Sequence, residues 1–168
     1  MNWRDELDNE LNIFKGGKVL IAGTGNPFRR DDAIGVVITK RLTEQFGKTQ
    51  QNFQDISVHT VGLTPEDCID IAVAEKPEIV IMIDACDAGL EPGEIVIFHE
   101  TDLPDGFHTS HSISPKFIAR MIHQLVGSKV IYLGIQIAEA GFGEEVSEAV
   151  GAAGAEVVRY FMEKPIFA

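Results

Sequence analysis

The length of 168 residues fits one domain of ordinary size, and we expect a single domain over 1–168. The composition, 45% hydrophobic and 24% charged, is globular, and no apolar run reaches the roughly 20 residues that cross a bilayer. The formal net charge of −12 lacks the basic footprint that nucleic acids and anionic membranes require, so we expect neither as a partner. Two cysteines and a charged N-terminus without a leader-like apolar stretch predict no disulfide framework and a cytoplasmic location.

The first third of the chain alternates between helical and extended patterns. Residues 1–15 are expected to form an N-terminal helical extension, because apolar side chains recur three or four positions apart: Trp3, Leu7, Leu11 and Phe14. A buried strand at 18–22 and a glycine-rich turn follow. A second helix ends near Gly47, and its core face carries Ile34, Val37, Ile38 and Leu42. Residues 56–61 are expected to form the second strand.

The middle of the chain holds one helix and two strands of different character. Thr64 and Pro65 predict a helix start, with a capping hydroxyl and a proline at the first position, and this helix must end before Pro77. Residues 79–83 are continuously apolar, which is typical of a strand covered on both faces. The next strand, 94–98, follows a loop too short for a helical crossover, so we expect it to be antiparallel and at an edge.

The last third adds a helix, a strand and a helix. Ser114 is the predicted cap of a helix that ends at Gly127, with a core face of Ile118, Met121, Ile122 and Leu125. A strand at 130–135 and a final helix over 144–164 complete the pattern. The expected fold is α/β: a three-layer sandwich around a five-stranded, mostly parallel, twisted sheet with one antiparallel strand, in a phosphorylase/hydrolase-like arrangement.

Candidate metal ligands follow the strands where parallel strands of α/β proteins build their sites. Asp32 lies between the first strand and its helix, Asp84 directly follows the most apolar strand, and His111 lies in the loop before the Ser114 helix. Two carboxylates and an imidazole suit nickel, zinc or a similar divalent ion. Simpler roles remain open: a helix-end charge for Asp32, a turn former for Asp84 and a hydrogen-bonded loop residue for His111. Asp31 is expected to be a helix N-cap, and His108 is a rival ligand.

Other patterns point less clearly to chemistry. Gly23 and Gly25 begin a dinucleotide-binding fingerprint, but Phe28 occupies the position of the third glycine. Cys68 and Cys86 lack a metal-binding spacing, and we expect both to be buried structural thiols. Three further histidines are expected to have structural or surface roles: His59, His99 and His123.

The ordered motifs resemble those of the hydrogenase maturation endopeptidases. The resemblance runs from about Val19 to Val150 and rests on these segments: Gly23-x-Gly25-Asn26, Asp31-Asp32-Ala33-Ile34-Gly35, Ile83-Asp84-Ala85, Pro92-Gly93-Glu94, Thr109-Ser110-His111 and Leu133-Gly134-Ile135-Gln136. It implies an endopeptidase that removes the C-terminal extension of a nickel–iron hydrogenase large-subunit precursor once nickel has been inserted.

The resemblance also implies the site. Carried over by position, the metal-contacting and catalytic residues are Asp32, Asp84 and His111, with glutamate common in relatives where Asp32 stands. The nickel is supplied by the substrate, and zinc or cadmium would substitute in the isolated protein. The expected partner is the large-subunit precursor, and we expect the protease itself to be a monomer.

One departure from the family pattern keeps an alternative open. Some members carry an acidic residue near the position of Thr60. Its loss leaves a second hypothesis, a non-catalytic maturation chaperone that binds a metal centre or peptide. The sequence also leaves open whether the metal polarises the scissile carbonyl and activates water, or only docks the substrate while Asp84 or Asp32 serves as general base.

Overall fold

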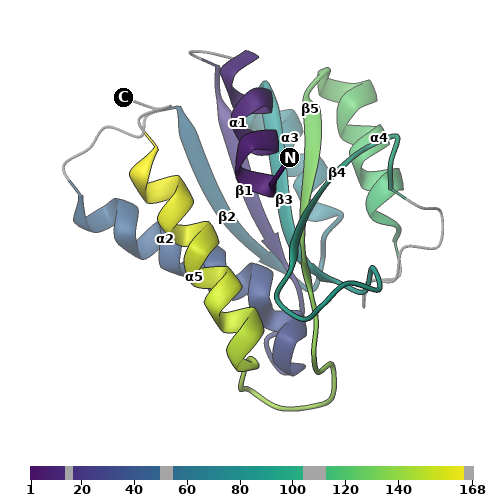
Figure 1. Ribbon diagram of the computed structural model, residues 1–168. Coiled ribbons are helices and arrows are strands. Elements are labelled where there is room, and N and C mark those ends of the chain that lie inside the picture. The colour runs from purple at the N-terminus through teal and green to yellow at the C-terminus, as the bar shows by residue number, and fades with distance from the viewer. Residues whose placement is uncertain (14–16, 50–54, 104–112, 165–168) are drawn as a thin grey trace.

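A five-stranded sheet forms the centre of the protein in this computed structural model, which describes residues 1–13, 17–49, 55–103 and 113–164. The strand order is β2-β1-β3-β5-β4 (Figure 1). The strands are β1 Val19–Thr24, β2 Ile56–Gly62, β3 Ile79–Cys86, β4 Ile95–His99 and β5 Lys129–Gln136. Every predicted strand is present. Strand β4 lies at one edge of the sheet and pairs antiparallel with β5, whereas the other pairings are parallel.

Helices cover both faces of this sheet, so the predicted three-layer α/β fold is confirmed (Figure 1). The helices are α1 Trp3–Ile13, the short 3-10 helix η1 Arg30–Ala33, α2 Ile34–Lys48, α3 Asp67–Glu75, α4 Pro115–Val126 and α5 Glu148–Glu163. Helices α1, α2 and α5 pack in one apolar cluster, and α3 and α4 pack in the other. Within the described residues, no helix is long and apolar enough to cross a membrane.

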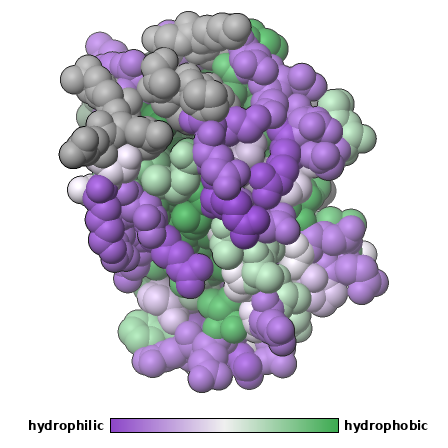
Figure 2. Space-filling view, turned by 60° about the vertical axis from the view of Figure 1, so that its left-hand side comes forward, coloured by the Kyte–Doolittle hydropathy of each residue, from purple (hydrophilic) through white to green (hydrophobic). Residues whose placement is uncertain are grey.

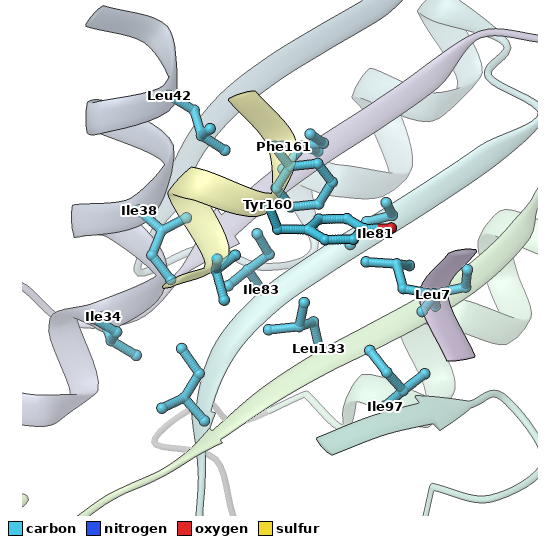
Figure 3. Packing of buried hydrophobic residues seen from close by; sticks show 14 of the residues in the cluster. Leu7, Ile34, Ile38, Leu42, Ile81, Ile83, Ile97, Leu133, Tyr160 and Phe161 are labelled. Carbon is cyan, nitrogen blue, oxygen red and sulfur yellow. The ribbon is translucent and has the colours of Figure 1, made fainter. Parts of the chain in front are cut away.

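The pleat of β3 assigns its side chains to the two clusters in turn. Ile79, Ile81 and Ile83 are buried with α1, α2 and α5, whereas Val80 and Met82 are buried with α3 and α4. Successive side chains of a strand alternate between faces, and both faces of β3 are covered, so its continuous apolar run is explained. Figure 3 shows the first of these clusters, in which residues of α1, α2 and α5 meet β3, β5 and β4.

One helix start follows its sequence signal and two do not. The Ser114 hydroxyl accepts a hydrogen bond from Phe117 N at 3.1 Å, so the predicted cap of α4 is confirmed. The predicted capping role of Thr64 is wrong: its hydroxyl donates to Asp67 Oδ2 at 2.7 Å, and α3 begins at Asp67 without a side-chain cap. The predicted start of the last helix at residue 144 is also wrong. Helix α5 begins at Glu148, because the backbone before it is hydrogen-bonded to Asp31.

The core face of α4 is narrower than predicted. Ile118 and Ile122 are buried, but Leu125 is 57% exposed. The helix ends at Gly127, whose φ of 81° is the left-handed conformation that glycine adopts without strain. The short connection between α4 and β5 reverses the direction of the chain, so the first turn of α4 lies near the C-terminal end of β5.

Candidate functional site

Asp84 lies near the C-terminal end of the central strand β3, at the end of the sheet where the parallel strands finish. The prediction that it directly follows its strand is wrong, because β3 continues to Cys86 through pairing with β5. Asp84 is therefore a strand residue, on the α3 and α4 face with Met82, and not a turn former. Its side chain is 1% exposed, and its Oδ1 accepts a hydrogen bond from Ala85 N at 2.8 Å. The strand backbone thus fixes the direction of this buried carboxylate.

Asp32 lies in η1, between β1 and α2, and is 8% exposed. Its Oδ2 accepts a hydrogen bond from Asn26 N at 3.2 Å. Gly25, the residue before Asn26, has a φ of +137°. A Cβ placed on it would lie 2.0 Å from the Asp32 carbonyl oxygen and 3.6 Å from Asp84 Oδ1. Gly25 therefore allows the backbone to pass between the two aspartates, and the structure brings these two predicted ligands together at one turn.

Tyr132 on β5 is a partner of this site that sequence reasoning missed. It pairs with Met82 in the sheet and is buried on the same face as Asp84. Burial raises the pKa of its phenol well above the ordinary value, and the nearby charge of Asp84 raises the pKa further. The available signal was a single phenol within the apolar strand at 130–135, since a buried tyrosine hydroxyl needs a polar partner.

The third predicted ligand, His111, and its rival His108 lie outside the described residues. The chain on either side is described: Leu103 and Ile113 both pack in the α3 and α4 cluster, on the face that carries Asp84. Among the residues that the structure covers, no three histidine, cysteine, aspartate or glutamate side chains form a group that could hold a metal. His111 as a ligand stays a prediction.

Asp31 is fully buried and has a role other than the predicted helix cap. Its carboxylate accepts hydrogen bonds from the backbone of Ala138, Glu139 and Ser147 at 2.7–2.8 Å, and from the Ser147 hydroxyl at 2.9 Å. Burial alone would raise the pKa of Asp31, but these bonds together outweigh it and hold the pKa below its ordinary value. Asp31 thus fastens the loop between β5 and α5 to the segment that carries Asp32, and this loop takes the place of the predicted start of α5.

The glycine-rich turn packs a helix closely and does not form a dinucleotide site. A Cβ on Gly35 would lie 2.2 Å from the Ile83 carbonyl oxygen and 2.3 Å from that of Thr24, so this glycine lets α2 approach β1 and β3. The carboxylates of Asp32 and Asp84 beside Gly25 would repel a pyrophosphate. This arrangement argues against the dinucleotide hypothesis.

Thr60 lies at the end of β2, beside Gly23 of β1. Its hydroxyl is 2.9 Å from the Thr39 hydroxyl of α2, and Thr39 also donates to the Gly35 carbonyl oxygen at 3.1 Å. A neutral hydroxyl pair therefore lies near the position where the family resemblance implies an acid in some members.

The thiols and the remaining described histidines serve the fold. Cys68 and Cys86 are free and buried, as predicted, and burial raises the pKa of each thiol to about 12, with nearby carboxylates adding to the shift. The three histidines have partners of their own: His59 Nε2 lies 2.6 Å from Glu75 Oε1, His99 Nε2 lies 3.5 Å from Glu10 Oε1, and His123 Nδ1 lies 3.2 Å from the Ser128 carbonyl oxygen.

Comparisons with known proteins agree with this fold. The sequence profile of the hydrogenase maturation protease family matches residues 36–164. The hydrogenase 3 maturation protease of Escherichia coli K12 is 36% identical over 120 residues, which cover 70% of this chain and 72% of that protein. The NiFe hydrogenase maturation protease HycI from Thermococcus kodakarensis superposes with a TM-score of 0.79 at 28% identity, over 92% of this chain and 97% of that one. The endopeptidase HycI from Escherichia coli superposes with a TM-score of 0.71 at 26% identity, over 84% and 87%. This chain therefore belongs to the hydrogenase maturation protease family.

Proposed function

We propose that this protein is an endopeptidase that removes the C-terminal extension of a nickel–iron hydrogenase large-subunit precursor after nickel insertion. The observation that carries the proposal is the buried aspartate pair, Asp32 and Asp84, on either side of Gly25. Membership of a family whose relatives are named maturation proteases and endopeptidases supports it. Two carboxylates held by backbone hydrogen bonds at the end of a parallel sheet are suited to binding a cationic centre.

In this proposal the substrate's nickel ion contacts Asp32, Asp84 and His111. The donor set fits the ion, because carboxylate oxygens and imidazole nitrogens are suitable ligands for divalent nickel. Zinc or cadmium would occupy the same position in the isolated protein, and with only three protein ligands such binding should be weak. Because the nickel comes with the substrate, its insertion into the precursor becomes the condition for cleavage.

The chain's own residues supply orientation and proton transfer. Ala85 N holds the Asp84 carboxylate, so the side chain loses little freedom when substrate arrives. The metal would polarise the scissile carbonyl or lower the pKa of an attacking water. Asp84 or Asp32 accepts a proton from that water as general base, and burial of both side chains limits competing solvent.

Substitutions at the three residues test this function. Asp84→Asn, Asp32→Asn and His111→Ala should each abolish processing of nickel-loaded precursor, read as a mass shift, while thermal unfolding shows that the fold remains. Asp32→Glu keeps the charge on a longer side chain and should retain substantial activity, as the glutamate of relatives suggests. Loss of activity in Asp32→Glu with full activity in Asp32→Asn would contradict the charge-based role.

The chaperone alternative has Thr60 as its specific support, since an acid is missing there. A single-turnover assay with enzyme in excess over nickel-loaded precursor separates the two functions. The endopeptidase releases the C-terminal peptide, and a chaperone binds the precursor without a change in its mass.

Metal soaking tests the ligand assignment separately from activity. Crystals soaked in zinc or cadmium should show density between Asp32, Asp84 and His111. Density on His108 with Asp31 would contradict the assignment. That outcome would also require Asp31 to give up its hydrogen bonds to Ser147.

A further inference from the structure

Exposed apolar side chains gather on the loops that surround the aspartate pair. The loops after β1, β2, β3 and β5 each expose one large apolar residue: Phe28, Leu63, Leu90 and Phe142. We call these four residues the apolar rim. Phe28 is 61% exposed and Phe142 is 87% exposed, which is unusual for phenylalanine in a well-packed protein. All four loops follow the C-terminal ends of parallel strands, at the lower end of the sheet in Figure 1. Asp84 near the end of β3 and Asp32 in the segment after β1 belong to the same end.

The Phe28 backbone and the Phe142 ring each have a fixed contact, although both side chains face solvent. Gly143 N donates to the Phe28 carbonyl oxygen at 2.9 Å, and Arg30 N donates to the Gly143 carbonyl oxygen at 2.9 Å. The Arg29 guanidinium lies over the Phe142 ring, 5.5 Å from its centroid. Asp31 accepts four hydrogen bonds from the loop between β5 and α5, which carries Phe142. Ordered aromatic anchors lose little conformational entropy on binding, which is a property of interface hot spots.

Acidic side chains lie around this rim. The exposed acids of the same loops and of the first turn of α3 include Asp67, Asp87, Glu91, Glu139, Glu144 and Glu145. Figure 2 shows hydrophobic (green) and hydrophilic (purple) side chains interspersed at the lower end of the molecule. With a net charge of −12 for the whole chain, this edge should attract a partner that carries basic residues and repel anionic lipid.

We infer that the apolar rim docks the folded body of the precursor, through an apolar patch flanked by lysine or arginine side chains next to the C-terminal extension. This inference rests on the proposed function and adds a second recognition element to it, separate from nickel. Strands β2 and β5 are three strand spacings apart, about 14 Å, so the rim is wider than one side chain and suits a protein surface. Docking there would place the precursor's extension over Asp32 and Asp84.

Binding and kinetics with matched variants test the inference. Phe28→Ser and Phe142→Ser should each raise the Kd for nickel-loaded precursor about tenfold or more, because both are candidate hot spots. The control is Leu125→Ser, which removes an apolar side chain about as exposed as Phe28 on the last turn of α4, away from this end of the sheet, and should change Kd less than about twofold. Cleavage by the phenylalanine variants should show a raised KM with an unchanged kcat, and wild-type Kd should rise with salt.

The outcomes separate this inference from the proposed function. If the wild-type protein cleaves the precursor and both phenylalanine variants bind it as tightly as wild type, the docking surface is wrong and the function stands. If the wild-type protein binds the precursor through the two phenylalanines but never cleaves it, the docking surface stands and the endopeptidase proposal is wrong. An absence of precursor binding by the wild-type protein would contradict both.

Discussion

Replacing Asp31 by asparagine tests how the loop before α5 is held. Three of the four hydrogen bonds to Asp31 end on Oδ2, from Ala138 N, Glu139 N and the Ser147 hydroxyl, and one ends on Oδ1, from Ser147 N. An asparagine with its oxygen in the Oδ2 position keeps the first three but turns its amide group toward the N–H of Ser147. The opposite orientation loses three bonds, so the first is the better one.

The expected cost follows from these contacts. One buried N–H loses its acceptor, at about 1–3 kcal/mol, and the three remaining bonds lose the charge of their acceptor, at about 1 kcal/mol each. The neutral side chain also escapes part of the desolvation penalty of a buried carboxylate, which offsets some of this loss. We therefore expect Asp31→Asn to lower the free energy of unfolding by about 3 kcal/mol and, at this chain length, to lower Tm by about 6–12 °C.

Chemical denaturation and hydrogen exchange would measure this effect. Asp31→Asn should lower the denaturant midpoint and increase exchange of the amides at 138–147, whereas Ser147→Ala, which removes one of the four donors, should cost about 1 kcal/mol. An unfolding free energy for Asp31→Asn within about 0.5 kcal/mol of wild type would refute the reasoning, since surface changes alone cause effects of that size.

The pH dependence of the stability difference between wild type and Asp31→Asn tests whether the pKa of Asp31 is lowered in the folded protein. The pKa of Asp31 is lower in the folded protein than its ordinary value of 3.8, so the folded state favours the charged form. Its contribution to stability is complete above that ordinary value and is lost as the pH falls through the lower, folded-state pKa. The stability difference between wild type and Asp31→Asn should therefore shrink below about pH 4 and be constant at neutral pH. A difference that grows on acidification would contradict the assignment.

Three further predictions concern the site and the core. Gly25→Ala should reduce both activity and stability, because its methyl group would lie 2.0 Å from the Asp32 carbonyl oxygen at a positive φ; activity and Tm equal to wild type would contradict this geometry. Tyr132→Phe removes the buried hydroxyl that lies in the field of the Asp84 charge and should lower kcat with little change in KM, measured on nickel-loaded precursor; an unchanged kcat would show that the hydroxyl does not influence the carboxylate. Both cysteine thiols should resist iodoacetamide in the native protein and react after unfolding, whereas rapid alkylation under native conditions would contradict their burial.

The fold was predictable because its signals are local. The strands carry apolar, β-branched runs, and the short loop before β4 allows only an antiparallel neighbour. Ser114 and Gly127 mark the two ends of α4 by well-known capping chemistry. The extension of β3 to Cys86 was not predictable from local sequence, since it depends on pairing with β5, about fifty residues later.

The meeting of Asp32 and Asp84 was predictable from the sequence, whereas the contacts of the residues around them were not. Asp32 and Asp84 come together because parallel strands end at one edge, which the order of elements already implies. Asp31 resembles a helix cap in sequence, but its partners lie more than 100 positions away, so only the folded chain reveals its role. The electrostatic influence of Asp84 on Tyr132 is likewise set by the sheet, since the two residues lie on neighbouring strands.

The central claim is that nickel in the substrate controls cleavage. The most direct measurement incubates the wild-type protein with two preparations of the same large-subunit precursor, one loaded with nickel and one free of it, and follows both by mass spectrometry. The account predicts that the nickel-loaded precursor loses its C-terminal extension while the nickel-free precursor keeps its full mass. Equal cleavage of the two preparations would contradict the account and would indicate a peptidase that recognises peptide sequence alone.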